Sequence, residues 1–145
     1  MLDKILQDND FIITMQKYCY EIITILTQKN IEFSIVVNTK FIDFNPELPK
    51  ELDLKQNPYT LFALGGYTFK SIQLTKDYIQ FHAGFGNDDF DSFVKVDLGA
   101  ITQIQVENNI IFVNFSLYKR KQNDSSEKSK TIFLNNPKNK DIFKK

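Results

Sequence analysis

The stretch that decides the fold is residues 78–113, YIQFHAGFGNDDFDSFVKVDLGAITQIQVENNIIFV, in which apolar and polar residues alternate repeatedly. A period of two is typical of strands that are covered on one face. Turn-forming residues interrupt the alternation at residues 86–89 and at Asn108-Asn109, and short connections of this kind favour antiparallel pairing. The stretch therefore predicts strands over 77–85, 90–98, 101–107 and 110–117.

The same period extends toward the N-terminus. Segments 31–37, 59–64 and 67–74 also alternate, and Gly65-Gly66 is predicted to be a tight turn between two of them, because it lacks the flanking residues of a phosphate-binding loop. Residues 40–57 are predicted to be a loop, since Pro46, Pro49 and Pro58 near its end lack the amide that a central strand needs.

An amphipathic helix is predicted ahead of the strands, over residues 11–28. Its apolar stripe recurs every three or four residues, and either Asn9 or Asp10 is expected to cap its first turn. Asn30 follows it at a position where a left-handed residue is common. The stripe is wider than one small sheet needs, so part of it is expected to face a second subunit. The predicted dimer contacts are Met15, Tyr18, Cys19, Ile22 and Ile25.

These elements predict an α+β fold, mainly β, with the helix packed on a small antiparallel barrel or sandwich. The 145 residues, 42% of them hydrophobic, suffice for one core, and no apolar run reaches the roughly 20 residues of a membrane helix. No export signal is recognisable, and the single cysteine cannot form an internal disulfide. A cytoplasmic location is expected.

Charge divides the chain into two regions. Residues 1–118 hold nine lysines against fifteen acidic residues, whereas residues 119–145 hold nine basic residues against three acidic ones. We therefore expect a folded domain over 1–118 and a flexible basic tail over 119–145, because so polar a tail buries too little surface to offset its ordering entropy.

Candidate catalytic groups are few. His82 is the only histidine and has no nucleophile beside it, while Cys19 lies inside the apolar stripe, where burial suppresses thiolate formation. The acidic residues Asp88, Asp89 and Asp91 lack the spacing of a calcium loop and are predicted to lie in a hairpin turn. The sequence predicts no enzyme, no metal site and no cofactor.

Residues 72–108 carry a more specific pattern. Leu74, Asp77, Ile79, Phe81, Ala83, Phe85 and Gly86, then Val94, Val96, Leu98, Ala100 and Ile101, then Glu107-Asn108, match in order and spacing a motif of the SspB family of protease adaptors. With the helix and first strand, the resemblance covers residues 10–115. Two positions depart from the motif: Asn87 replaces a second glycine and Asp97 replaces a proline.

The resemblance to SspB implies a non-catalytic, homodimeric adaptor with an Sm-like or SH3-like barrel or sandwich. Members bind the degradation tag (ssrA tag) of proteins from stalled ribosomes and deliver them to the protease ClpXP. The N-terminal helix forms the dimer contact in the family. A C-terminal module docks on the unfoldase ClpX, and here the matching residues are Ile142, Phe143 and Lys144.

The same residues give the expected peptide site a physical basis. Ala83 stands between larger apolar side chains of one strand face, and so predicts a hollow for an extended peptide. Gly84 and Gly86 would let the peptide backbone approach closely. The predicted peptide-binding residues are Phe81, Ala83, Gly84, Phe85 and Gly86. The alternative is that Ala83 merely fits a packed core.

A second function class remains open, an Sm-like or OB-like barrel that stacks RNA bases on exposed aromatic rings. The net charge of minus six over residues 1–118 argues against it, because basic residues gather in the tail and not along a groove. The sequence leaves open which tag residues are read, which other substrates are delivered and which residues of 40–57 border the groove.

Overall fold

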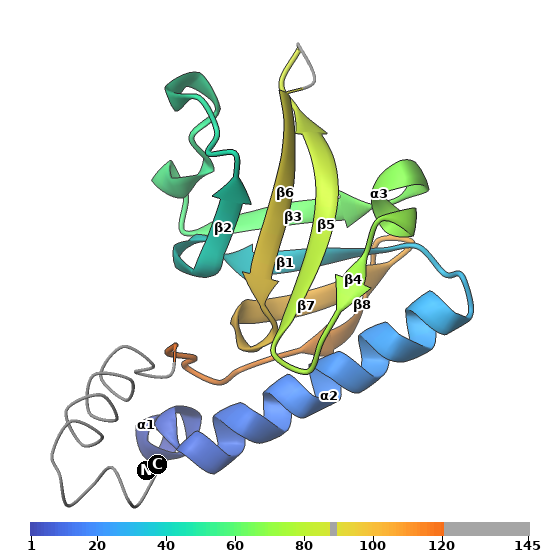
Figure 1. Ribbon diagram of the computed structural model, residues 1–145. Coiled ribbons are helices and arrows are strands. Elements are labelled where there is room, and N and C mark those ends of the chain that lie inside the picture. The colour runs from blue at the N-terminus through green and yellow to red at the C-terminus, as the bar shows by residue number, and fades with distance from the viewer. Residues whose placement is uncertain (88–89, 121–145) are drawn as a thin grey trace, which may run out of the picture.

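The fold is an α+β arrangement of one long helix and two antiparallel sheets of four strands each. The computed structural model describes residues 1–87 and 90–120. Figure 1 shows the strands of one sheet running across those of the other, with the long helix beneath them. The strands are β1 (Phe33–Asn38), β2 (Ile42–Asn45), β3 (Tyr59–Leu64), β4 (Gln73–Leu74), β5 (Tyr78–Phe85), β6 (Phe90–Asp97), β7 (Ile101–Val106) and β8 (Asn109–Val113).

Two helices open the chain, α1 (Leu2–Gln7) and α2 (Asn9–Gln28). The side chain of Asp8 accepts hydrogen bonds from the amides of Asp10 and Phe11, so the cap of α2 lies one residue before the predicted candidates Asn9 and Asp10. Asn30 has φ of 57°, as predicted for the residue that ends the helical region. The apolar stripe of α2 buries Ile12, Cys19, Ile23 and Leu26.

Sheet A has the strand order β3-β1-β7-β8 and sheet B the order β2-β6-β5-β4. The β5 and β6 strands form the longest hairpin, from Tyr78 opposite Asp97 to Phe85 opposite Phe90. The two sheets do not join into a closed barrel, so the sandwich of the two predicted alternatives is the one observed. Among residues 1–87 and 90–120, the edge strands are therefore β3 and β8 in sheet A and β2 and β4 in sheet B.

Two local predictions were wrong. Residues 67–74 form the short helix α3 (Gly66–Lys70) and only then β4, so Gly65-Gly66 starts a helix instead of a hairpin. Gly66 has φ of 57°, and its amide donates to the Glu32 carboxylate at 2.9 Å, which fixes this helical start from outside the segment. Residues 40–57 contain β2 and short 3₁₀ turns besides loop.

The core lies between the two sheets and α2. Nearly every strand contributes its alternate residues, and α2 contributes three side chains from its buried stripe. The largest fully buried side chains are Phe81, Ile23, Ile35, Ile42, Leu64, Ile79, Leu98, Ile101 and Ile104. One contiguous core of this kind fits a single folding unit.

The folded part continues past β8 as a segment that we call the strap, residues 114–120. Asn114 is buried and donates to the carbonyls of Gly99 and Ile101, and the Leu117 amide donates to the Leu6 carbonyl at 2.7 Å. Arg120, the last described residue, also makes side-chain contacts with the folded part.

Candidate functional site

The face of β5 that was expected to form the peptide hollow is largely the core face. Phe81 is 1% exposed and its ring lies 5.3 Å from that of Phe62, so it cannot line an open groove. The prediction for Phe81 was therefore wrong. Period two correctly grouped Phe81 with Ala83 and Phe85, but an apolar strand face packs first against the interior of its own chain.

Further along β5 the same face opens. Ala83 and Phe85 are half-buried, in contrast to Phe81, and pack at the margin of the core. The Phe85 ring meets the rings of Phe44 and Phe62, with centroids 5.8 and 6.4 Å away. Ala83 thus lies at the solvent-facing margin of the sandwich and not at its centre.

The edge of β5 that faces away from β6 is also open at this end. The β4 strand covers the edge only as far as Gln80, and the Ser71 hydroxyl accepts the His82 amide at 2.9 Å. Backbone groups alternate in direction along a strand, so the amide and carbonyl of Gly84 point to the same edge as those of His82. They have no partner among the residues that the structure describes.

The loop between β2 and β3 borders this end of β5. A Cβ on Gly86, which has φ of 74°, would lie 2.9 Å from Cδ2 of Leu52, so the loop that includes Leu52 packs directly against the hairpin. Leu48 and Leu54 pack against the core from the same loop. Among residues 40–57, Leu52 therefore borders Gly86 and Phe44 packs against Phe85, a point that the sequence alone left open.

The outer face of β5 and β6 carries exposed aromatic rings. The His82 ring lies between Tyr67 and Phe93, with centroids 5.5 and 4.6 Å away, and Nδ1 of His82 is 3.0 Å from the Tyr67 hydroxyl. Tyr67 and Phe93 are exposed. Lys95 lies over the Tyr78 ring on the same face.

The five predicted dimer residues divide by exposure. Cys19 is completely buried in the core of its own subunit and cannot contact a partner, so this prediction was wrong. Met15 and Ile22 are half-buried against the same core. Tyr18 and Ile25, one helical repeat of seven apart, are each 50% exposed and remain available.

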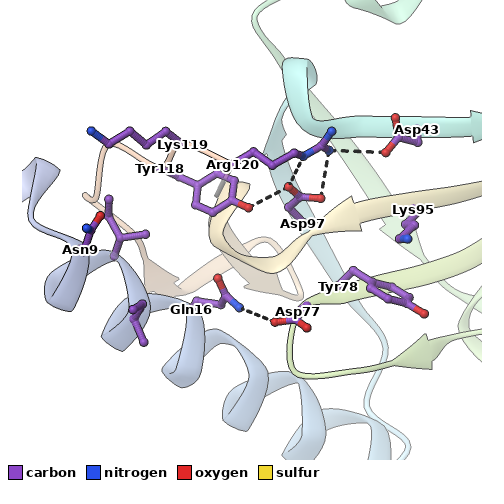
Figure 2. Close-up of a pocket in the computed structure, with 12 residues that line it drawn as sticks. Asn9, Gln16, Asp43, Asp77, Tyr78, Lys95, Asp97, Tyr118, Lys119 and Arg120 are labelled. Atoms are coloured by element: carbon purple, nitrogen blue, oxygen red, sulfur yellow. Dashed lines mark hydrogen bonds and ion pairs between the residues drawn. The ribbon is translucent and has the colours of Figure 1, made fainter. Parts of the chain in front are cut away.

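A cavity of about 990 Å³ lies elsewhere, between the first half of α2 and one end of sheet B. Figure 2 shows Gln16 reaching Asp77 across it, and Gln16 also donates to the Lys76 carbonyl at 3.0 Å. Acidic and basic side chains both line the cavity, which holds none of the predicted peptide-binding residues.

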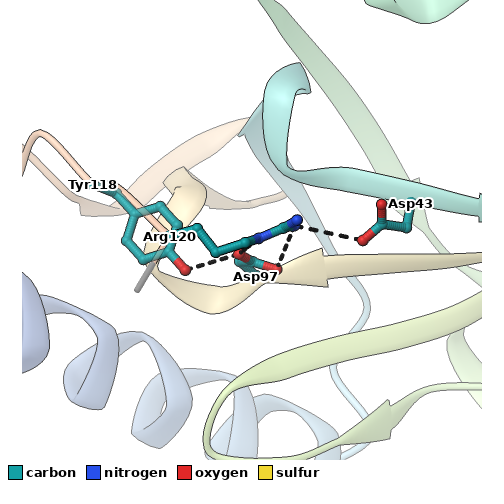
Figure 3. A network of polar contacts seen from close by, with 4 residues as sticks. All are labelled: Asp43, Asp97, Tyr118 and Arg120. Carbon is teal, nitrogen blue, oxygen red and sulfur yellow. Dashed lines mark hydrogen bonds and ion pairs between the residues drawn. The ribbon is translucent and has the colours of Figure 1, made fainter. Parts of the chain in front are cut away.

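A polar network closes one side of that cavity (Figure 3). Arg120 donates through Nε and Nη2 to Asp97 at 2.8 and 3.1 Å, and its Nη2 lies 3.5 Å from Asp43. The Tyr118 hydroxyl donates to Asp97 at 2.8 Å. Burial, and then this hydrogen bond, raise the pKa of Tyr118 well above its ordinary value. The network fastens the strap to sheet B.

The strap also fits tightly at Gly99. A Cβ on Gly99 would overlap the Tyr118 ring, which packs edge-on against the ring of Phe41 with centroids 4.9 Å apart. Sequence patterns do not indicate this contact, because Gly99 and Tyr118 both lie outside the predicted strands.

Groups that support bond-breaking chemistry are sparse in the described part of the chain. Burial raises the pKa of the Cys19 thiol far above its ordinary value, so Cys19 stays protonated and unreactive. No group of three metal-ligating side chains is found in residues 1–87 and 90–120. Within the same residues, no helix is both long and apolar enough to cross a membrane.

Comparison with known proteins adds no relative. No family model matches the chain, and no curated protein matches it. The expected docking residues Ile142, Phe143 and Lys144 lie outside the described residues.

Proposed function

We propose that this protein is a non-catalytic adaptor that binds an extended degradation tag at the open end of β5 and delivers tagged proteins to ClpXP. The observation that carries the proposal is the combination at one place of a half-open apolar face, Ala83 and Phe85, and an open backbone edge at Gly84.

This combination suits a peptide that binds as an added strand. Main-chain hydrogen bonds to an open edge supply affinity without regard to sequence, and alternate side chains of the peptide reach the adjoining apolar surface. Gly84 has no side chain to keep the peptide away, and Ala83 leaves room beside Phe85. Phe81 then serves as support beneath the site and not as a contact.

The resemblance to the SspB family supports the same location. The matching motif includes Ala83, Phe85 and Gly86, and all three lie at the open end of β5 or in its turn. The sandwich with an N-terminal helix is compatible with the Sm-like or SH3-like fold of that family, and we propose that identity for it. A cytoplasmic location follows from the proposed role.

Assembly is part of the proposal. Tyr18 and Ile25 on the outer side of α2 are proposed to contact a second copy, and the C-terminal residues Ile142, Phe143 and Lys144 to dock on ClpX. Two peptide sites and two docking segments in one particle raise the effective concentration of cargo at the unfoldase.

The peptide site is tested with a matched pair of variants, Gly84→Pro and Gly84→Ala. Proline removes the amide that would bond to the peptide, and edge positions tolerate it because this amide is not needed by β6. Losing one hydrogen bond of about 1.4 kcal/mol weakens binding about tenfold. We expect Gly84→Pro to show this loss and Gly84→Ala to stay within about twofold of the wild type.

The measurement is a fluorescence-anisotropy titration with a synthetic tag peptide, and circular dichroism confirms that each variant is folded. Ala83→Gln fills the open apolar face and is expected to abolish binding while the fold is kept. If folded Gly84→Pro and Ala83→Gln both bind the peptide as the wild type does, the proposed site is wrong.

One observation favours a second function, RNA binding. The exposed rings of Tyr67 and Phe93 flank His82 on a sheet face, which is a geometry that stacks bases. The strand of Phe93, β6, also carries Asp91 and Asp97, whose negative charges repel a phosphate backbone. A salt-dependent gel shift that Phe93→Ala abolishes would establish this function instead.

A further inference from the structure

A second apolar surface lies on β8 and the start of the strap. Its exposed large side chains are Ile110, Ile111, Val113, Phe115 and Leu117. Phe115 is 67% exposed, more than any other residue of this group. Five such residues within eight positions form a strip of the kind that monomeric proteins rarely leave in water.

The strip is uncharged. Residues 108–118 contain no acidic or basic side chain, whereas residues 1–118 as a whole carry a net charge of minus six. A contact between two copies of an acidic protein along this strip therefore brings no like charges of the strip together. A two-fold interface places the same patch on both subunits, so a patch without charge meets itself without like charges in contact.

We propose that the strip on β8 and the strap packs against a second copy of this chain and completes the dimer contact of α2. The inference rests on the homodimer of the proposed function. In Figure 1, β8 is drawn just above α2, and the Leu117 amide donates to the Leu6 carbonyl at 2.7 Å, which places the strap beside α1.

The apolar areas of α2 and of the strip favour one interface that includes both surfaces over two separate interfaces. The α2 helix is about 30 Å long, and the strip, residues 109–117, spans at most about 30 Å. With a width of about 10 Å each, the two surfaces offer about 600 Å² together, and a stable interface needs about 800 Å² per partner. Neither surface alone approaches that value. Leu2 and Ile5 of α1 are exposed and add apolar area beside α2.

The contact is side-chain packing and not a continued sheet. The pairing of β7 with β8 shifts between Ile104 and Gln105, which leaves Ile111 without a partner in the register. A bulge of this kind bends an edge strand and discourages further strand pairing. The apolar side chains of the strip still project to solvent.

The test uses the two free edges of sheet A as a matched pair. Ile110 on β8 and Leu61 on β3 are 53% and 52% exposed, so lysine at either position costs the fold about equally. We expect Ile110→Lys to raise the dimer dissociation constant at least tenfold and Leu61→Lys to leave it within about twofold of the wild type. Light scattering and analytical ultracentrifugation at micromolar concentrations measure both.

Phe115→Glu provides a second variant outside the strand, for which loss of folding is not expected, and it should weaken the dimer as Ile110→Lys does. Dimers of unchanged affinity in both variants would overturn this inference. If Tyr18→Arg then separates the subunits, the α2 dimer of the proposed function survives without the strip. A wild-type monomer would overturn both dimer contacts, while the titrations of the Gly84 variants still decide the peptide site.

Discussion

Replacing Asn114 with alanine should destabilise the whole domain, because this buried side chain holds the strap to the end of sheet A. Its Nδ2 donates to the carbonyls of Gly99 and Ile101 at 3.1 and 3.2 Å. Its Oδ1 accepts from the amide and the hydroxyl of Ser116 at 2.8 and 2.6 Å. Asn114→Ala removes these four hydrogen bonds at once.

The expected magnitude follows from the environment of each partner. A net value of about 1 kcal/mol per hydrogen bond gives about 4 kcal/mol for the four. Ser116 is only half-buried, so water can replace part of what its amide and hydroxyl lose. The free energy of unfolding should therefore fall by about 3 kcal/mol, a large share of the 5–15 kcal/mol typical of a domain.

Urea unfolding followed by circular dichroism measures this change. With an m value of about 1–3 kcal/mol per M, the midpoint should fall by about 1–3 M. Asn109→Ala is the control, because Asn109 lies at the other end of β8, is exposed and donates one hydrogen bond to the Glu107 carbonyl. A loss below about 1 kcal/mol for Asn114→Ala, no larger than for Asn109→Ala, would refute the reasoning.

Three further predictions concern the core and the strap. Phe81→Ala should lower the free energy of unfolding by about 3–5 kcal/mol in urea titrations, as a core residue does, and a loss below 1 kcal/mol would contradict its burial. The thiol of Cys19 should react with a disulfide reagent at least a hundredfold more slowly in native protein than in urea, and equal rates would show that it is accessible. Because the pKa values of Cys19 and Tyr118 are raised in the fold, from reference values of 9.0 and 10.0, the unfolded chain releases these protons first. The contribution of these two groups to the free energy of unfolding should therefore be complete below pH 9 and be lost as the pH rises above it. The loss should be smaller in Tyr118→Phe. A free energy of unfolding that does not change with pH in this range would contradict the raised pKa values.

Much of the strand layout was predictable from local sequence. The alternation over β5, β6 and β7, with turn residues between them, specifies both the strands and their antiparallel order. The α2 helix was predictable for the same reason, since its stripe has the helical period. These signals are local and need no knowledge of the partner surface.

The errors arose where contacts distant in sequence decide the outcome. Tyr67 and Phe69 fit a strand pattern, yet α3 forms because Glu32, more than thirty residues earlier, accepts the Gly66 amide. The uncharged run after Asn109 was predicted as one strand to residue 117, but β8 ends at Val113 because the Asn114 side chain turns inward to bond two carbonyls.

The exposure of the candidate site residues was only partly predictable. Period two shows that Phe81 and Ala83 share a face, but it cannot show that the other sheet covers that face at Phe81 and leaves it half-open at Ala83. Likewise, the helical period places Cys19 in the stripe of α2 without telling which part of the stripe the subunit itself buries.

The contact between Gly99 and Tyr118 restricts how this protein can diverge. Because the Tyr118 ring occupies the space that any side chain at position 99 would need, a larger residue there requires a smaller one at 118. Relatives that keep the strap should therefore vary at these two positions together. Such paired substitutions would make the strap recognisable in sequences that share little else with this one.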